Sequence, residues 1–345
     1  MRRNFAFLAV GILILGLGAG VVLYDQLFRD GGIEAESVRF SVERGWSLGR
    51  VAEELADAQL LAHPWQLRLV ARIEGGSRRI RAGDYLLPRG ASPARLLHEL
   101  VEGRLQMRSL TVPEGWRLER TLVALSDSLG QPIALLDSLA RNPSSEWRDR
   151  LDLPPGVSLE GYLFPETYHF VRGTPGSRLL ETMLDGLAEV FDATARARAD
   201  SMGWSIHQVL TLASIVEAEA VFDDERARVA AVYHNRLRKG WKLEADPTVA
   251  FALRKEGERL TFADLEVDSP YNTYRNAGLP PGPINSPGRA SILATLEPEP
   301  GFDAMYFVAD GTGRHRFSRT WDEHRAAVQE YRRWQRQQRA AGGSG

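Results

Sequence analysis

The first feature of the hydrophobic pattern is a long uncharged run at the N-terminus. Arg2 and Arg3 come first, and the run then extends over residues 4–24. About 20 apolar residues suffice for a helix to cross a bilayer, and preceding positive charges keep the N-terminus in the cytoplasm. We expect a cytoplasmic end at 1–4 and an uncleaved anchor at 5–27, with the remaining chain outside. A cleaved signal peptide is the alternative, although its apolar stretch is usually only about 7–15 residues.

Three later segments share one pattern, in which a short strand-like piece is followed by a turn and an amphipathic helix. They are residues 40–57, 85–102 and 110–127, with turns at Gly45, Gly90 and Gly115. Ser47 and Ser92 are suitable N-cap residues, and Pro93 suits a first helical turn. The first two segments resemble the LysM fold, a β-α-α-β module that binds glycans containing N-acetylglucosamine. We expect a LysM-like subdomain at 36–108; a plain α+β connector domain is the alternative.

The pattern from residue 109 to residue 345 predicts a second domain of mixed helices and strands with long ordered loops. Helical periodicity covers about 176–202, 205–221 and 223–239, and a shorter helix is expected at 291–298. Residues 304–311 have the pattern of a buried strand, and an Arg-rich helix follows from 322. Between them, the loop 268–288 is rich in Gly and Pro, and a loop of this length in a compact domain is usually functional or disordered. The fold class is therefore α+β.

The composition of the chain excludes several kinds of partner and site. The formal net charge is −2 over 345 residues, which argues against nucleic acid as a partner. The chain has no cysteine, so disulfides and thiolate metal sites are excluded. The histidines lack metal-ligand spacing. We expect neither a metal nor a cofactor.

One glutamate lies on an apolar helix face. With Ser205 as N-cap and Gln208 completing a capping box, the periodicity puts Glu217 within an apolar stripe and Glu219 on the opposite, also apolar, side. The stripe contains Ile206, Val209, Leu210, Ala213, Val216, Ala220 and Val221. Burial raises a carboxyl pKa, so Glu217 is a candidate general acid. The alternative is a structural ion pair with Arg226, Arg228 or Arg236. Glu219 has the pattern of a structural residue.

A second constellation lies upstream. Glu160 and Glu166 flank an aromatic cluster, and aromatic faces beside carboxyl groups suit sugar rings. The cluster consists of Tyr162, Phe164 and Tyr168. An aromatic core strand is the competing interpretation.

Seven motifs occur in a recognisable order. They are LEGYLFPETY (159–168), LASIVEAEA (212–220), VYHNRL (232–237), DPTV (246–249), YNTYRNAGLPPGPI (271–284), SPGRASI (286–292) and YFVADGTGRHRF (306–317). In this order the chain resembles the MltG/YceG-like family of membrane-anchored endolytic murein transglycosylases over nearly its whole length. Three positions depart from the usual family residues, with Ala218 for Lys, Glu166 for Asp and Ser286 for Asn. None of these removes the acid.

The resemblance implies a peptidoglycan lyase that cuts the bond between N-acetylmuramic acid (MurNAc) and N-acetylglucosamine (GlcNAc) in nascent strands. It places the catalytic residue at Glu217 and leaves a 1,6-anhydro-MurNAc end. It also implies a single-pass protein of the inner membrane with an extracytoplasmic catalytic domain, and peptidoglycan synthases as partners. The candidate substrate-binding residues in these motifs are Glu160, Tyr162, Glu166, Tyr168, Asn235, Asp246, Thr248, Tyr271, Asn272, Tyr274, Pro281, Gly282 and His315.

Two alternatives stay open. A muramidase-type hydrolase on the same fold would need a second carboxylate. That group would either activate a water molecule for attack on the sugar or attack the sugar covalently itself. The candidates for that group are Asp223, Glu244, Asp246 and Glu160. A non-catalytic, peptidoglycan-binding scaffold is the other alternative.

Overall fold

The computed structural model describes residues 2–30, 37–75, 80–102 and 107–342. The chain divides into two units, which are described separately. The first contains residues 1–109 and 169–174, and the second contains residues 110–168 and 175–345. Residue 1 of the expected cytoplasmic end lies outside the described residues, as do residues 36, 76–79 and 103–106 of the expected LysM-like subdomain.

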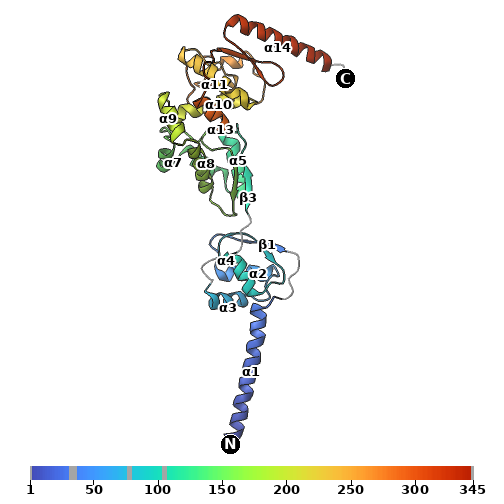
Figure 1. The fold of residues 1–345 in the computed structure, drawn as a ribbon. Helices are drawn as coiled ribbons and strands as arrows, with labels where there is room; N and C mark the ends of the chain where they lie inside the picture. The colour runs from blue at the N-terminus through green and yellow to red at the C-terminus, as the bar shows by residue number, and fades with distance from the viewer. Residues whose placement is uncertain (1, 31–36, 76–79, 103–106, 343–345) are drawn as a thin grey trace. The chain divides into compact units, whose positions relative to one another are not determined.

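The first unit begins with the helix α1 and continues as a small α+β arrangement (Figure 1). Its elements are α1 (Arg2–Phe28), β1 (Ser37–Val42), α2 (Leu48–Asp57), α3 (Pro64–Glu74), β2 (Gly83–Pro88) and α4 (Pro93–Glu102). The strands β1 and β2 pair in an antiparallel register. Ser47 caps α2 through its side chain, as expected. The β1-α2-α3-β2 order is that of the β-α-α-β module, but its relation to LysM domains remains a prediction.

The apolar residues of this unit form one core around Val51, Leu55 and Leu96. Leu27, near the end of α1, is part of this core and only 2% exposed. Earlier in α1 the apolar side chains are exposed, for instance Leu13 at 68% and Leu15 at 75%. No helix within the residues that the structure describes is both long enough and apolar enough to cross a membrane.

The second unit is mainly helical, with short strands. Its elements after β3 (Arg108–Thr111) are α5 (Leu118–Leu129), α6 (Ile133–Arg141), α7 (Ser145–Arg150), β4 (Thr167–Phe170), α8 (Gly176–Val190), α9 (Ala193–Ser201), α10 (Ile206–Glu219), α11 (Asp223–Arg238), α12 (Asp246–Leu253), the 3-10 turn η1 (Asp264–Glu266), α13 (Arg289–Leu296), β5 (Tyr306–Ala309), β6 (His315–Ser318) and α14 (Trp321–Gly342). Two-stranded sheets form between β3 and β4 and between β5 and β6. The chain passes into the second unit within β3, back into the first within β4, and into the second again after residue 174.

Helix α10 is the central element of the second unit, and it packs against α11 and α13 (Figure 1). Its residues Val209–Val216 are all buried, so the expectation of a helix buried on most faces is confirmed. The predicted capping box is present, because the Ser205 N–H donates to Gln208 Oε1 (2.9 Å) and the Gln208 N–H donates to Ser205 Oγ (3.3 Å). Val221, expected in the apolar stripe, lies beyond the helix end and is 70% exposed.

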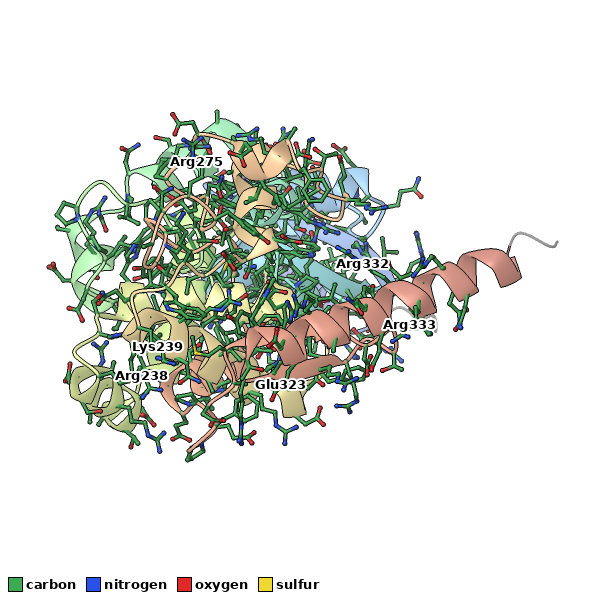
Figure 2. All side chains as sticks on the ribbon, turned by 90° about the horizontal axis from the view of Figure 1, so that it is seen from above. Arg238, Lys239, Arg275, Glu323, Arg332 and Arg333 are labelled. Carbon is green, nitrogen blue, oxygen red and sulfur yellow. The ribbon has the colours of Figure 1, made fainter. Side chains whose placement is uncertain are left out.

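Two other expectations need correction. The predicted helix at 176–202 is two helices, because the first helix ends with Phe191 as its C-cap. Asp192 then accepts the Ala195 N–H as the N-cap of α9. The strand expected to be buried within 304–311 is only partly buried, since it belongs to a two-stranded sheet with one neighbour. The Arg-rich terminal helix is present as α14, and its Arg332 and Arg333 (Figure 2) line a surface pocket together with Arg259 and Phe262.

The capping box gives a stability prediction. Substituting Ser205→Ala removes the side-chain acceptor at the start of α10, and this should lower the free energy of unfolding by about 1 kcal/mol. Ser201→Ala is the control, because Ser201 is exposed and bonds only to the Arg198 carbonyl of its own helix. Urea unfolding of both variants measures the difference. Equal effects would contradict the capping assignment.

Candidate functional site

Glu217 lies in the last turn of α10, where its side chain is 8% exposed. Its Oε2 atom accepts the Gly288 N–H (3.0 Å) and the Ser291 hydroxyl (2.8 Å). The Arg226 guanidinium lies 3.2 Å from the same oxygen. Three groups from two other helices therefore converge on one carboxylate oxygen.

The neighbouring helices explain this convergence. Gly288 is the N-cap of α13, so Glu217 meets the helix end at which backbone N–H groups lack partners and the helix dipole is positive. Arg226 lies one turn into α11, where Asp223 holds its Nε at 2.9 Å. Arg226 also donates to the Ser291 hydroxyl. The site is thus built by the packing of α10, α11 and α13.

The sequence led us to expect that burial alone would keep Glu217 protonated. The structure shows the ion pair with Arg226 that was the alternative interpretation, together with two hydrogen-bond donors. All three lie at Oε2, and within the described chain nothing donates to Oε1. Because a neutral carboxyl group can accept at its carbonyl oxygen and donate from the other, this geometry accommodates a proton on Oε1. It also stabilises the carboxylate after the proton leaves.

Glu219, two residues further along, has a different environment. Its Oε1 accepts the Tyr233 hydroxyl at 3.0 Å. Burial, reinforced by the nearby charge of Asp246, raises the pKa of Glu219 to about 7 against the opposing effects of Tyr233 and Arg236. The expectation that Glu219 is structural stays a prediction.

Two cavities flank this region. The first, of about 530 Å³, is called the Glu219 cavity. It is lined by Gly115, Arg117, Glu219, Asp246, Phe251 and Asn285, among others. The second, of about 520 Å³, is called the Glu114 cavity. It is lined by Glu114, Phe164, Glu166, Tyr168, Glu189 and Arg289, among others. Consecutive residues, Glu114 and Gly115, therefore line the two cavities, and a Cβ atom built on Gly115 would lie 3.9 Å from Glu217 Cγ.

Asn285 is a wall residue of the Glu219 cavity with an unused acceptor. Its Nδ2 donates to the Ser214 carbonyl at 2.9 Å, which fixes the orientation of the amide. The side chain is 5% exposed, and its Oδ1 is buried without a partner in the described chain. A buried acceptor without a partner is costly, and Asn285 is one of the residues that line the Glu219 cavity.

The structure separates the predicted residues of the aromatic segment. Glu160 accepts the Leu118 N–H at the start of α5 (2.9 Å), and burial raises its pKa to about 7. Tyr162 is fully buried and bonds His207 Nδ1 at 2.8 Å. Tyr168 is buried and donates to the Phe164 carbonyl. All three side chains thus have partners within the fold, and Tyr168 also lines the Glu114 cavity together with the exposed Glu166.

Three further predicted binding residues are at most 7% exposed and have their donors used within the protein. Asn235 donates to the carbonyls of Phe302 and Ala304. Thr248 donates to the Ala245 carbonyl, and Asn272 donates to those of Leu265 and Val267. Asn235 lines a separate cavity of about 710 Å³ that does not include Glu217 or Glu219. The geometry therefore gives these three side chains a role in shaping loops.

Two of the remaining predicted residues of the 268–288 loop support the wall of the Glu219 cavity, and the other two lie against the start of α10. Tyr274 donates to Asp246 Oδ1 at 2.6 Å, and Asp246 lines that cavity. The ring of Tyr271 packs on Phe251, which lines it as well. The Pro281 carbonyl bonds His207 Nε2 at 2.8 Å. Gly282 lies against His207 and Tyr271, so these two positions brace the loop against α10.

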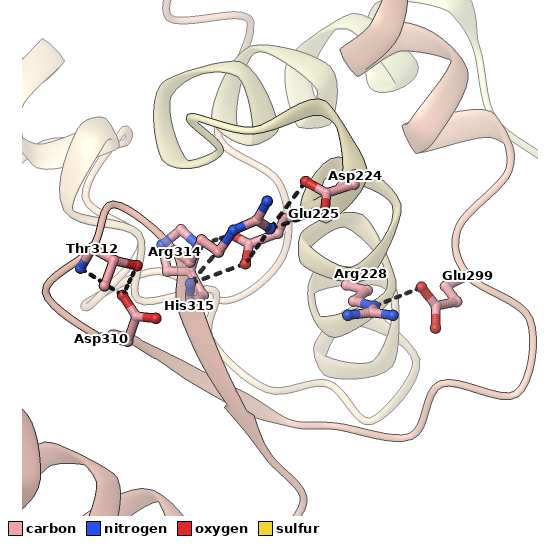
Figure 3. A network of polar contacts seen from close by, with 8 residues as sticks. All are labelled: Asp224, Glu225, Arg228, Glu299, Asp310, Thr312, Arg314 and His315. Atoms are coloured by element: carbon pink, nitrogen blue, oxygen red, sulfur yellow. Dashed lines mark hydrogen bonds and ion pairs between the residues drawn. The ribbon is translucent and has the colours of Figure 1, made fainter.

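His315, the last predicted residue, belongs to a polar network on α11 and the β5–β6 sheet (Figure 3). Its Nδ1 lies 3.0 Å from Glu225 Oε2, and its side chain is 10% exposed. Arg314 pairs with Asp224 at 2.9 Å in the same network. The structure thus brings His315 to Glu225 rather than to either cavity.

Sequence reasoning missed four residues of the site, namely Glu114, Gly288, Ser291 and Asn285. It named Arg226 only as a structural partner. No local pattern identifies these residues, because Gly288 and Ser291 meet Glu217 across more than 70 positions. The Pro-Glu-Gly turn before α5 was the one available signal for Glu114.

Together these features define an α+β protein whose site is a carboxyl group held between three helices and bordered by two polar cavities. The chain belongs to the YceG-like family, which matches residues 40–330. It is 32% identical to the endolytic murein transglycosylase of Bacillus subtilis (strain 168), with 92% of this chain and 91% of that protein covered.

Two other proteins are similar. The endolytic murein transglycosylase of Streptococcus pneumoniae (strain R6) is 27% identical, and the match covers 87% of this chain and 60% of that protein. The crystal structure of a yceG-like protein from Listeria monocytogenes matches with a TM-score of 0.59 and 30% identity, covering 85% of this chain and 99% of that one.

The raised pKa of Glu219 predicts a pH effect on stability. A folded-state pKa of about 7, above the unfolded value, means that the contribution of Glu219 is greatest below about pH 4.5 and is lost as the pH rises through 7. Glu219→Gln removes this loss, so the variant should gain roughly 1–3 kcal/mol relative to the wild type between pH 5 and pH 8. Chemical unfolding at the two pH values measures it. A constant difference between the proteins would rule out the shifted pKa.

Proposed function

We propose that this chain is an endolytic peptidoglycan lytic transglycosylase that cuts the MurNAc–GlcNAc bond of nascent glycan strands. The family membership and the names of the relatives support the substrate class. The observation that carries the chemistry is the Glu217 carboxyl group, held through one oxygen with the other oxygen unpaired within the described residues. Such a group can give and take a proton without moving.

In the proposed reaction, protonated Glu217 donates from Oε1 to the glycosidic oxygen. The C1–O bond breaks through an oxocarbenium-like state, and GlcNAc leaves with the proton. The ionised Glu217 then removes the proton of the C6 hydroxyl of the same MurNAc residue. O6 bonds to C1, which closes the 1,6-anhydro ring and restores the protonated carboxyl group. No water is consumed.

The contacts at Oε2 suit both halves of this cycle. Gly288 and Ser291 can donate to a carbonyl oxygen as well as to a carboxylate. Arg226 compensates the negative charge that appears on Glu217 in the first step, as preorganised groups do in enzymes. When Glu217 is neutral, Asp223 still provides a counter-charge for the buried guanidinium.

The binding surface that we propose runs along the Glu219 and Glu114 cavities. Of the residues expected to bind the glycan, Asp246 and Glu166 retain the best case, because they line the two cavities. Tyr271 and Tyr274 support the same wall through Phe251 and Asp246. Asn285 Oδ1 suits the N–H of an N-acetyl group or a sugar hydroxyl.

We also propose that α1 anchors the protein in the inner membrane and that the second unit works at the outer face. The support is the uncharged run at 4–24, the preceding arginines and the exposed apolar side chains. Large apolar groups exposed along one helix are costly in water. An anchored enzyme would meet new strands close to the membrane, where cleavage would end their elongation. Peptidoglycan synthases would be within reach of the enzyme at the same place. In sequence, the proposed LysM-like module at 36–108 follows the anchor and precedes the catalytic domain that begins at 109.

Glu217→Gln is the direct test of the acid. The amide keeps the shape but cannot transfer the proton, so anhydro-ended products should fall by about 100-fold or more. The full chain in detergent, incubated with uncrosslinked glycan strands and followed by chromatography and mass spectrometry, measures this. The control is Asp200→Asn, because Asp200 is exposed on α9. Glu189 is unsuitable as a control position because it lines the Glu114 cavity. An active Glu217→Gln protein would remove the assignment.

The anchor has its own test. The substitutions Ile14→Lys and Leu17→Lys should each cost about 2.5–3.5 kcal/mol in a membrane helix. The doubly substituted chain should therefore move from the membrane pellet to the soluble fraction on fractionation. Ile73→Lys, on α3 at a position that is 60% exposed, should not change the distribution. A doubly substituted chain that stays in the pellet as the wild type does would contradict the proposed anchor.

A further inference from the structure

The surface pocket beside helix α14 is called the Arg pocket, and it has a volume of about 660 Å³. It is lined by Arg259, Arg332, Arg333, Arg336 and Phe262, together with two glutamines. Figure 2 shows Arg332 and Arg333 on α14, whereas Arg259 comes from the segment between α12 and η1. Two segments that are distant in sequence thus bring four arginines to one pocket, and none of its described lining residues is acidic.

The acidic residues of α14 are engaged outside the Arg pocket. Glu330 pairs with Arg316, Asp322 pairs with Arg325, and Glu323 accepts backbone N–H groups just before the helix. Within the described chain, no carboxylate forms an ion pair with any of the four arginines of the pocket. The pocket therefore holds a local excess of positive charge that an anionic ligand would balance.

The helix dipole does not account for this cluster. Basic residues complement the dipole only within the last turn of a helix. Arg332 and Arg333 lie nine residues or more before the end of α14 at Gly342, which is more than two turns. Arg332 and Arg336 are four residues apart, a spacing at which like charges destabilise a helix. The cluster thus opposes helix formation unless an anion binds, and Arg259 belongs to no part of this helix.

The Arg pocket adjoins the Glu219 cavity, because Arg259 lines both of them. Glu256 and Glu258, its neighbours in sequence, line the Glu219 cavity together with Glu219 and Asp246. One surface therefore passes from a cavity with several carboxyl groups to a pocket with several arginines. The acidic part repels anionic groups of a ligand and the basic part attracts them. A ligand with an uncharged part and an anionic part is oriented by this change of sign.

A peptidoglycan strand has two such parts. Its sugar backbone is uncharged, whereas the stem peptide on each MurNAc residue carries free carboxylates and small apolar side chains. Planar guanidinium groups bind carboxylates through two parallel hydrogen bonds. Phe262 is 88% exposed and offers an apolar face beside the arginines. The chemistry of the Arg pocket therefore matches the peptide, and that of the adjoining cavity matches the sugars.

We propose that the Arg pocket binds the free carboxylates of stem peptides on a strand whose sugars occupy the Glu219 cavity. This inference rests on the proposed function and adds a selection among its substrates, since strands with free carboxylates are preferred to strands with amidated peptides. Arg332, Arg333 and Arg336 follow residue 330, where the match to the YceG-like family ends. The pocket therefore lies largely outside the part of the chain that the family match covers.

Substrate discrimination by the full chain in detergent tests the pocket. Uncrosslinked strands with free stem-peptide carboxylates are compared with strands whose carboxylates have been converted to amides by a carbodiimide and ammonia. Because charge-assisted hydrogen bonds are lost, the wild-type kcat/KM should be about 10-fold higher for the first preparation. The triple variant Arg332→Gln, Arg333→Gln, Arg336→Gln should bring this ratio to about one.

The matched control is Arg325→Gln, the same substitution on the same helix at an exposed residue outside the pocket. This variant should keep the wild-type ratio. Equal wild-type kcat/KM values for the two preparations would overturn the inference. A triple variant that keeps the wild-type ratio would also overturn it, whatever its overall activity, because a merely structural effect lowers both values together.

A competition measurement on the wild type needs no variant. A soluble stem peptide with free carboxylates should inhibit cleavage, and its amidated form should inhibit about 10-fold less strongly. Equal inhibition by the two forms would overturn the inference. Stronger inhibition by inorganic phosphate, or by phosphatidylglycerol added to the micelles, would assign the pocket to another anion and overturn it too. A failure of the proposed function is distinct, because the wild type would then release no anhydro ends from either preparation.

Discussion

The contact of Glu217 Oε2 with the start of α13 and with Arg226 is the interaction on which the site depends. It joins a buried helix, α10, to two helices that approach it from other parts of the chain. A carboxyl group with 8% exposure would be costly without such partners. All of these partners lie at one oxygen, and the other oxygen has none within the described chain. In the function that we propose, this second oxygen is the one that transfers the proton.

Several neighbouring features follow from this constraint. Gly288 must lack a side chain, because Glu114 occupies the space beside it. The buried side chain of Asn272 holds the 268–288 loop in place by donating hydrogen bonds to the backbone carbonyls of Leu265 and Val267. The carboxyl group of Glu219 lines the Glu219 cavity, and burial raises its pKa. The structure gives no contact between Glu219 and Arg226 within the described residues. The polar residues of this region thus divide into those that build the loops and those that face the cavities.

The sequence predicted the parts of this structure that depend on local order. Ser205 and Gln208 fixed the start of α10, and helical periodicity placed Glu217 on a buried face. The break between α8 and α9 was missed, because Asp192 has a short-range capping role inside an otherwise continuous helical pattern. Asn235, Thr248 and Asn272 resembled binding residues, since a sequence pattern does not distinguish an amide that bonds a ligand from one that bonds the backbone. Glu114 was missed because its partners are brought to it only by tertiary packing.

The most direct test of the central claim is the chemical identity of the new glycan end. The full chain, incubated with uncrosslinked strands in water enriched in 18O, releases fragments whose ends mass spectrometry can assign. Our account predicts 1,6-anhydro-MurNAc ends without heavy oxygen, since O6 of the same sugar is the nucleophile. Reducing ends that carry 18O would contradict it and would identify a hydrolase on the same fold.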